Sequence, residues 1–155
     1  MQARKNPAAS RPQFLAPNSE ARREGRPASE AKGRVLIVED DVPLSAVVED
    51  TLTHEGYAVV GTARSADEAI SMAVAHGPDL VLMDVRLLDN SDGIAAAGQI
   101  LERTGIRCLM ATGQTDAKTK ARAAMVQPLG WLPKPYSNKE MVQAVANALR
   151  CNRAS

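Results

Sequence analysis

The sequence predicts an α/β fold in which five parallel strands alternate with five helices in an open, doubly wound (βα)5 sheet. From Arg34 onward, short strand-like runs alternate with longer segments of helical periodicity. Two of the runs, Val35–Val38 and Leu80–Met83, are apolar at every position, which is typical of parallel strands covered by helices on both faces. Because crossovers between parallel strands are right-handed, such a chain forms an open sheet between two helical layers.

The first half of the predicted domain holds three strands and two helices. After the strand Val35–Val38, Pro43 suits the first turn of a helix that ends before Gly56. The apolar residues of this helix are Leu44, Val47, Val48 and Leu52. Tyr57–Gly61 predicts the second strand, and the capping box Ser65–Glu68 opens the second helix. The apolar face of that helix is Ala69, Ile70, Ala73 and Val74. The run Leu80–Met83 is the third strand.

The second half continues the alternation. Helical periodicity over 94–101 ends at Gly105, and Ile106–Ala111 is expected to be the fourth strand. An Ala-rich helix is predicted over 116–126, followed by a very short strand at Leu129–Leu132. A second capping box, Ser137–Glu140, opens the last helix. The apolar side of that helix is Val142, Val145, Ala148 and Leu149.

Composition limits the class of protein. The chain has 155 residues, 45% of them apolar and 24% charged, which fits one globular domain with a tail. No apolar run could span a bilayer, and the N-terminus has no apolar stretch of the kind found in secretory signals. Cys108 and Cys151 match no zinc spacing and are too few for a disulfide framework, so a cytoplasmic location is expected. Aromatic residues, at 3%, argue against a base-stacking platform.

The charge is unevenly distributed along the chain. Residues 1–33 hold seven Lys and Arg, three acidic residues and four prolines, which predicts a flexible basic tail. Residues 34–150 form the expected domain, and 151–155 a frayed C-terminal end. The tail is either a passive extension or a weak docking arm for a partner, and the sequence leaves both open.

Acidic residues follow the first and third predicted strands. Glu39, Asp40 and Asp41 come directly after the first, and Asp84 directly after the third. Each set alone could cap a helix, and Asp41 is well placed to do so. If strands 1 and 3 are neighbours, as in the sheet order 2-1-3-4-5, the carboxylates of Glu39, Asp40 and Asp84 converge. Oxygen ligands of this kind suit Mg²⁺, which would offset the repulsion between them.

Two further polar residues end the fourth and fifth strands. Thr112 offers a hydroxyl beside Gly113, and Lys134, between two prolines, offers a charge on a long stem. With Asp84 as nucleophile, these groups are the parts needed to position an in-line phosphoryl transfer.

The chain resembles the receiver domain of two-component response regulators, in its single-domain, chemotaxis-regulator-like form, over residues 34–150. The residues that carry the resemblance are Val35–Asp41, Pro78–Leu87, Asp92-Gly93, Ala111–Gly113 and Gly130–Tyr136. All of these occur in order, each one βα unit apart. The resemblance implies a flavodoxin-like sheet of order 2-1-3-4-5.

By this resemblance Asp84 accepts a phosphoryl group from a sensor histidine kinase or a histidine phosphotransfer protein. The implied metal ligands are Glu39 (through water), Asp40, Asp84 and the backbone carbonyl of Arg86. Thr112 and Lys134 would contact the phosphoryl oxygens. The Lys134–Pro135 bond is expected to be cis, as in the family.

The resemblance also implies a switch. Thr112 would turn toward the phosphoryl group and Trp131 would change rotamer with it, altering the face formed by the fourth helix, fifth strand and fifth helix. That face would bind a downstream protein target. Trp131 could instead be static core filler. Arg86 and Gln114, two residues after Asp84 and Thr112, are predicted to set the dephosphorylation rate.

The loop after Asp84 departs from the usual family pattern. Four residues after Asp84 this chain has Leu88, where the family usually has proline. The glycine, Gly93, comes nine residues after Asp84 instead of eight, so the loop is one residue longer than usual. We therefore expect the loop geometry beside Asp84 to differ from the usual family pattern, whereas the chemistry of the site is expected to be retained. The switch aromatic, Trp131, is also bulkier than the usual Tyr or Phe, so we expect its coupling to the site to differ.

Function follows as an expectation with alternatives. The chain is expected to be a single-domain response regulator that signals by phosphorylation-dependent protein interaction, by phosphorelay or as a phosphate sink, without enzymatic activity beyond self-catalysed phosphotransfer and slow autodephosphorylation. No DNA-binding unit follows the last helix, which argues against transcriptional output. The alternatives are an unphosphorylated receiver-fold interaction module and a Mg²⁺-dependent aspartyl phosphohydrolase. Such hydrolases resemble one another in a second Asp two residues after the nucleophile, where this chain has Arg86.

Overall fold

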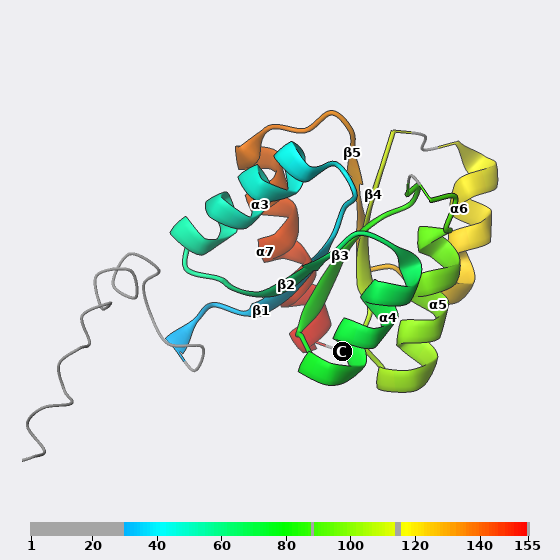
Figure 1. The fold of residues 1–155 in the computed structure, drawn as a ribbon, viewed down its shortest axis with the longest axis horizontal. Helices are drawn as coiled ribbons and strands as arrows, with labels where there is room; N and C mark the ends of the chain where they lie inside the picture. Colours follow the sequence, from blue (N-terminus) through cyan, green and yellow to red (C-terminus); the bar gives the residue numbers. More distant parts are fainter. Residues whose placement is uncertain (1–29, 88, 114–115, 155) are drawn as a thin grey trace, which may run out of the picture.

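Five parallel strands form one sheet in the computed structural model, which describes residues 30–87, 89–113 and 116–154 (Figure 1). The strands are β1 (Arg34–Val38), β2 (Ala58–Ala63), β3 (Leu80–Asp84), β4 (Cys108–Thr112) and β5 (Gly130–Pro133). Their order in the sheet is β2-β1-β3-β4-β5. The helices are α3 (Val42–His54), α4 (Ala66–His76), α5 (Gly93–Thr104), α6 (Ala117–Ala123), the 3-10 turn η4 (Ala124–Val126) and α7 (Asn138–Ala154). The predicted fold class and strand order are confirmed.

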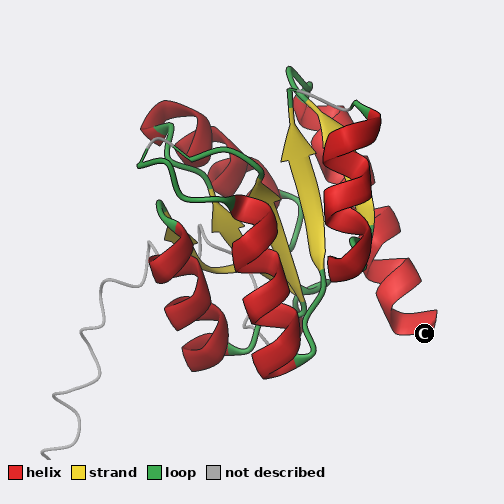
Figure 2. Ribbon diagram, turned by 90° about the vertical axis from the view of Figure 1, so that its right-hand side faces the viewer, coloured by secondary structure: helices red, strands yellow, loops and turns green. Residues whose placement is uncertain are grey.

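Helices cover both faces of the sheet, as the apolar runs predicted (Figure 2). In β1, Val35 and Ile37 pack into a core shared with α3 and α7. Leu36 and Val38 point the other way, into a core shared with α4 and α5. All four are at most 1% exposed. Successive strand residues face opposite sides, so only a continuously apolar strand can serve two cores.

Polar side chains start the helices at the carboxyl ends of the strands. Asp41 caps α3 by accepting a bond from the Leu44 amide at 3.0 Å, and Ser65 caps α4. Ser137 and Glu140 exchange bonds of 2.8 and 3.0 Å, which confirms the predicted capping box before α7. Asp41 is thus a helix cap, and it lies outside the cluster of three carboxylates described below.

Element ends differ from the sequence-based expectation in a few places. The Ala-rich helix expected over 116–126 is α-helical only as far as Ala123, and its last turn is 3-10. β2 runs two residues beyond Gly61, to Ala63, and its register against β1 shifts between Val35 and Leu36. Residues 151–154 of the expected C-terminal end lie in α7, where Cys151 is exposed.

Two valines assigned to apolar faces are exposed. Val47 in α3 is 47% exposed and Val74 in α4 is 54% exposed. The buried residues of α3 include Ser45 in place of Val47, because α3 is rotated so that the 45–48–52 stripe meets the sheet. Helical spacing thus located both helices, but in each it assigned one exposed residue, Val47 in α3 and Val74 in α4, to the buried face.

The described chain joins the domain before the predicted boundary at Arg34. The Lys32 amide donates to the Gly56 carbonyl at 2.9 Å, and the Ala58 amide to the Gly33 carbonyl at 2.9 Å. The Arg153 guanidinium donates to the Lys32 carbonyl at 2.6 Å. The expected tail over 1–33 otherwise lies outside the described residues. Among the described helices, none combines the length and apolar composition that a membrane span requires.

Candidate functional site

Strands β1 and β3 are neighbours, and this brings the predicted acidic residues to one edge of the sheet. Glu39 directly follows β1, and Asp84 is the last residue of β3. One carboxylate oxygen from each of Glu39, Asp40 and Asp84 lies within 4.8 Å of the other two. Glu39 and Asp84 are only 5% and 6% exposed, whereas Asp40 is half-buried. The convergence expected from the strand order is present.

Lys134 lies against two of these carboxylates. Its Nζ atom is 2.9 Å from Oε2 of Glu39 and 3.0 Å from Oδ2 of Asp84. Lys134 follows β5, so its long side chain extends toward strands that lie further inside the sheet. The Lys134–Pro135 bond that turns the chain after β5 is cis, as expected.

Burial and neighbouring charged groups both shift the pKa values of Glu39 and Lys134. Burial raises the pKa of Glu39 and the charge of Asp84 adds to the rise, which hydrogen bonds from Lys134 and the Asp41 amide only partly offset. Burial lowers the pKa of Lys134, but its hydrogen bonds to Glu39 and Asp84 outweigh this, so that pKa is raised. The cluster thus holds three carboxylates, and the Lys134 ammonium contacts two of them, Glu39 and Asp84.

This donor set fits a hard divalent cation. Carboxylate oxygens at this spacing, partly open to solvent, are what Mg²⁺ takes when it keeps several waters. A cavity of about 520 Å³ opens over the cluster, lined by Glu39, Asp40, Asp41, Asp84, Arg86, Leu87, Asn90 and Lys134. Its volume leaves room for an ion, its waters and a further group.

The second cavity at this edge exposes the other side of Asp84. It has a volume of about 270 Å³ and is lined by Asp84, Arg86, Thr112, Gly113 and Lys134. Thr112, the last residue of β4, is 4% exposed. Asp84, Thr112 and Lys134 therefore surround one small space, as the sequence predicted.

The backbone after β3 holds the Asp84 carboxylate in place. Its Oδ1 accepts a bond from the Arg86 amide at 3.2 Å. The Gly93 amide donates to the Val85 carbonyl at 2.9 Å. A Cβ atom at Gly93 would lie 2.0 Å from the Asp84 carbonyl oxygen, so only glycine allows α5 to start this close to β3. The longer loop still returns to the site, although Leu88 lies outside the described residues.

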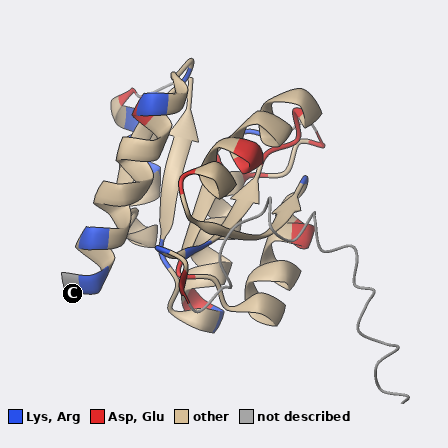
Figure 3. Ribbon diagram, turned by 90° about the vertical axis from the view of Figure 1, so that its left-hand side faces the viewer, with Lys and Arg blue, Asp and Glu red and all other residues tan. Residues whose placement is uncertain are grey.

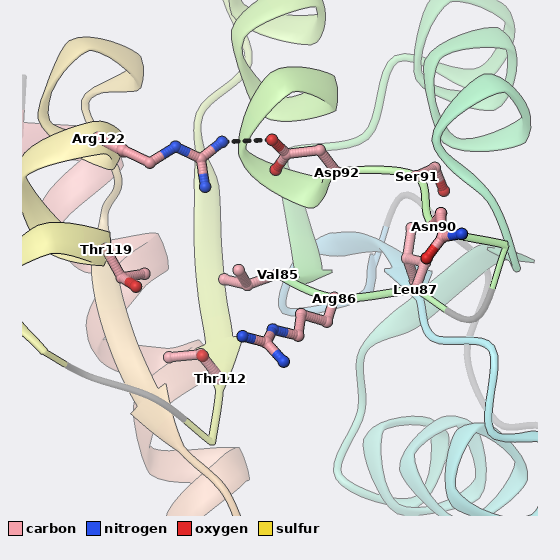
Figure 4. Close-up of a pocket in the computed structure, with 9 residues that line it drawn as sticks. All are labelled: Val85, Arg86, Leu87, Asn90, Ser91, Asp92, Thr112, Thr119 and Arg122. Carbon is pink, nitrogen blue, oxygen red and sulfur yellow. Dashed lines mark hydrogen bonds and ion pairs between the residues drawn. The ribbon is translucent and has the colours of Figure 1, made fainter.

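A third cavity, of about 320 Å³, lies beside the site between the β3–α5 loop, the end of β4 and α6 (Figure 4). The Arg86 side chain extends across it toward Thr112, so these two residues line both this cavity and the smaller one. On its far side, the guanidinium of Arg122 forms an ion pair with Asp92, the N-cap of α5.

Trp131, the proposed switch residue, lies on β5 and is partly buried against the core under α4 and α5. The Nζ atom of Lys120 in α6 is 5.9 Å from the centroid of its ring, within reach of a cation–π contact. Gln114 lies outside the described residues. Arg86 is at the site, but the roles assigned to Arg86, Thr112 and Trp131 remain predictions.

Sequence reasoning missed the contacts of α6. In the sequence Asp92 stands out only as part of an Asp-Gly motif, and no pattern marks Lys120 or Arg122. The Arg122–Asp92 pair joins residues 30 positions apart, and no local pattern signals it.

An acidic cluster, a lysine and a threonine meet at the carboxyl edge of a 2-1-3-4-5 sheet, which defines an open α/β domain with a candidate cation site. Residues 35–146 match the family model of the response regulator receiver domain, and the chain belongs to this family. Receiver domains are signalling modules of two-component systems.

Curated relatives extend beyond this region. The transcriptional regulatory protein PdtaR of Mycobacterium tuberculosis is 37% identical over 118 residues, which is 75% of this chain and 56% of PdtaR. The probable transcriptional regulator ycf27 of Cyanophora paradoxa is 27% identical over 77% of this chain and 49% of its own length. The chain therefore spans about half the length of the curated relatives it matches.

Solved structures agree on the fold. The signal receiver domain of a modulated diguanylate cyclase from Desulfovibrio desulfuricans G20 has a TM-score of 0.71 at 29% identity, covering 79% of this chain and 97% of that one. A mutant form of the anti-anti-sigma factor PhyR of Bartonella quintana has a TM-score of 0.65 at 26% identity, over 89% of this chain and 55% of PhyR. A CheY-like receiver domain protein from Methanospirillum hungatei JF-1 has a TM-score of 0.71 over 78% of this chain and 96% of that one, and at 23% identity it supports the fold alone.

Proposed function

We propose that this protein is a response regulator whose Asp84 accepts a phosphoryl group from a histidine kinase or a histidine phosphotransfer protein. The observation that carries the proposal is the surroundings of Asp84. Its carboxylate lies at the end of β3 with Lys134 at 3.0 Å and with the Glu39 and Asp40 carboxylates within 4.8 Å. A cytoplasmic location belongs to the same proposal.

In the proposed reaction an Asp84 carboxylate oxygen attacks the phosphorus of a phosphohistidine. The new O–P bond forms as the P–N bond breaks, and the electron pair leaves with the imidazole, which takes up a proton. Asp40, Asp84 and the Arg86 backbone carbonyl would hold Mg²⁺ directly and Glu39 would hold it through water, and the ion would neutralise charge on the phosphoryl oxygens. Phosphoryl transfer needs mainly positioning and charge neutralisation, which this arrangement of side chains can provide.

Two residues would hold the phosphoryl group once it is attached. The Lys134 ammonium would move its hydrogen bond from the Asp84 carboxylate to a phosphoryl oxygen, because its Nζ atom already lies 3.0 Å from Oδ2 of Asp84. Thr112 lines the small cavity beside Asp84 and Lys134, and its hydroxyl would donate a further hydrogen bond to the phosphoryl group. Each charge-assisted bond contributes ~1.5–3 kcal/mol, enough to shift a two-state equilibrium tenfold.

The signal would leave through the surface of α6, β5 and α7. Lys120 of α6 lies over the ring of Trp131 on β5, and Arg122 of α6 pairs with Asp92 in the loop that follows Asp84. We propose that output is a phosphorylation-dependent protein interaction or a phosphorelay. Arg86, at the mouth of the site, and Gln114 would set the lifetime of the phosphorylated state.

Phosphorylation with a small donor tests the proposal. The purified protein is incubated with Mg²⁺ and acetyl phosphate, and the gain of one phosphoryl group is followed by intact mass. Asp84→Asn should abolish the gain, whereas Asp89→Asn, a change at an exposed acid of the same loop, should preserve it. Labelling of the Asp84→Asn variant would show that another residue is the acceptor. No labelling of the parent protein, by acetyl phosphate or by a phosphorylated histidine kinase, would favour an interaction module that is not phosphorylated.

A further inference from the structure

Charge in the described domain is divided between its two halves. Residues 30–104 contain five Lys and Arg and fourteen acidic residues, whereas residues 105–154 contain eight Lys and Arg and two acidic residues. Figure 3 shows this division from the side of α7, with blue segments towards the C-terminal end of that helix and mostly red segments over the other half. The ion pair between Arg122 and Asp92 joins the halves, because it links α6 of the basic half to the start of α5 in the acidic half.

Few buried side chains hold α6 on the domain. Ala123 is the one buried residue among the seven of this helix, whereas five of the twelve residues of α5 are buried. A short helix with so little buried surface opens and shifts at low free-energy cost. The polar contacts of α6 therefore contribute a large share of what keeps it in place.

The carboxylate of Asp92 serves two helices at once. Its Oδ1 atom accepts a bond from the Ile94 amide at 2.9 Å and so caps α5, whereas its Oδ2 atom pairs with the Arg122 guanidinium (Figure 4). The backbone of Asp92 also pairs with that of Arg86 in an isolated antiparallel bridge. The Arg86 amide in turn donates to Oδ1 of Asp84 at 3.2 Å. Direct contacts thus run from Asp84 along the β3–α5 loop to α6.

We propose that the Arg122–Asp92 pair is a tether that holds α6 against the β3–α5 loop and opposes occupation of Asp84 by a phosphoryl group. The pair draws α6 and the loop together across the 320 Å³ cavity. A phosphoryl group on Asp84 adds bulk and negative charge beside this cavity, so the loop or α6 must give way. The tether presupposes the proposed function, because Asp84 is taken as the acceptor.

This contact is separate from the predicted switch, which acts through Thr112 and Trp131. The two side chains of the pair are 51% and 38% exposed, and exposed ion pairs are weak, so the tether biases the position of α6 without fixing it. Coupling between two sites is reciprocal. Breaking the tether should therefore favour the state in which Asp84 carries the phosphoryl group.

Hydrogen exchange of the full, unphosphorylated chain tests the tether without a phosphoryl donor. Arg122→Gln should speed amide exchange over residues 117–126 by about three- to fivefold, and Arg122→Lys, which keeps the charge, should restore most of the protection. Asp92→Asn should act like Arg122→Gln, because Asn still caps α5. Combining the two changes should add nothing, since both remove the same contact. Lys118→Gln, at an exposed cation of α6, is the matched control and should change exchange by less than about twofold.

Titration with beryllofluoride and Mg²⁺, which mimic the attached phosphoryl group, tests the coupling to Asp84. Trp131 fluorescence follows the titration. Arg122→Gln should lower the half-saturating concentration of beryllofluoride by about threefold relative to the parent, whereas Lys118→Gln should leave it within about twofold.

Unchanged exchange in Arg122→Gln and Asp92→Asn, or effects that add in the double variant, would overturn the tether. An unchanged or higher half-saturating concentration in Arg122→Gln would show that the pair does not oppose the phosphoryl group. A parent protein that does not respond to beryllofluoride would count against the proposed function, and the exchange measurements would still decide whether Arg122 and Asp92 hold α6 in place.

Discussion

Removal of the Lys134 ammonium tests the electrostatics of the site without any phosphoryl donor. Lys134→Ala leaves Glu39 and Asp84, whose side chains are only 6% and 8% exposed, facing each other without the cation that now lies 2.9 and 3.0 Å away. Breaking a buried pair by removing one partner costs roughly 3–5 kcal/mol, because the remaining charge is left unpaired in a medium of low dielectric. A quarter of the Lys134 side chain is exposed, so we expect the lower end, a loss of about 3 kcal/mol.

Mg²⁺ should restore much of the stability that Lys134→Ala loses. An ion bound among Glu39, Asp40 and Asp84 neutralises the same carboxylates that Lys134 faces, and a ligand at 100 times its dissociation constant stabilises by about 2.7 kcal/mol. We therefore expect saturating Mg²⁺ to stabilise the variant more than the parent protein. Urea unfolding with EDTA and with Mg²⁺ measures both effects, with Trp131, the single tryptophan, as the reporter.

Lys139→Ala is the matched control, because Lys139 is an exposed lysine in the first turn of α7. It should change the free energy of unfolding by less than ~0.5 kcal/mol. The reasoning is refuted if Lys134→Ala is as stable as the parent in EDTA. It is also refuted if Mg²⁺ stabilises both proteins equally, since the ion would then not act on the carboxylates that Lys134 faces.

Three further predictions follow from the packing and the titratable groups. Gly93→Ala should destabilise the protein by more than ~3 kcal/mol in urea unfolding, because its Cβ would overlap the Asp84 carbonyl oxygen at 2.0 Å. Gly98→Ala in the same helix meets only a Val side-chain atom at 3.3 Å and should stay within about 1 kcal/mol; equal effects would contradict the packing argument. The raised pKa of Glu39 means that the native state binds this proton more tightly than the unfolded chain, so its contribution to stability falls as pH rises from 4.5 through the folded pKa. Without Mg²⁺, the free energy of unfolding of Glu39→Gln should therefore increase relative to that of the parent as the pH rises through this range. A difference between the two proteins that does not change with pH would contradict the raised pKa of Glu39. Burial raises the pKa of Cys108 to about 12, so iodoacetamide should modify Cys151 alone in the native protein and both thiols in urea.

The sequence determined the fold class and the site's acidic residues. The runs Val35–Val38 and Leu80–Met83 are apolar throughout because both faces of β1 and β3 are covered, and this can be recognised from composition alone. Carboxyl ends of parallel strands share one edge, so the position of Asp84 directly after such a run already placed it at the site. The resemblance to receiver domains then supplied the strand order that brings Glu39 beside it.

Tertiary structure decided which long side chains meet. Lys134 lies between Glu39 and Asp84, 95 and 50 residues earlier in the chain, and Arg122 reaches Asp92 across 30 residues. The sequence pattern shows which residues are apolar and which are charged. The partner of a long charged side chain, however, depends on how the neighbouring helices and strands pack. The same reason explains the exposed Val47, because spacing locates a helix whereas its rotation against the sheet is fixed only by the assembled core.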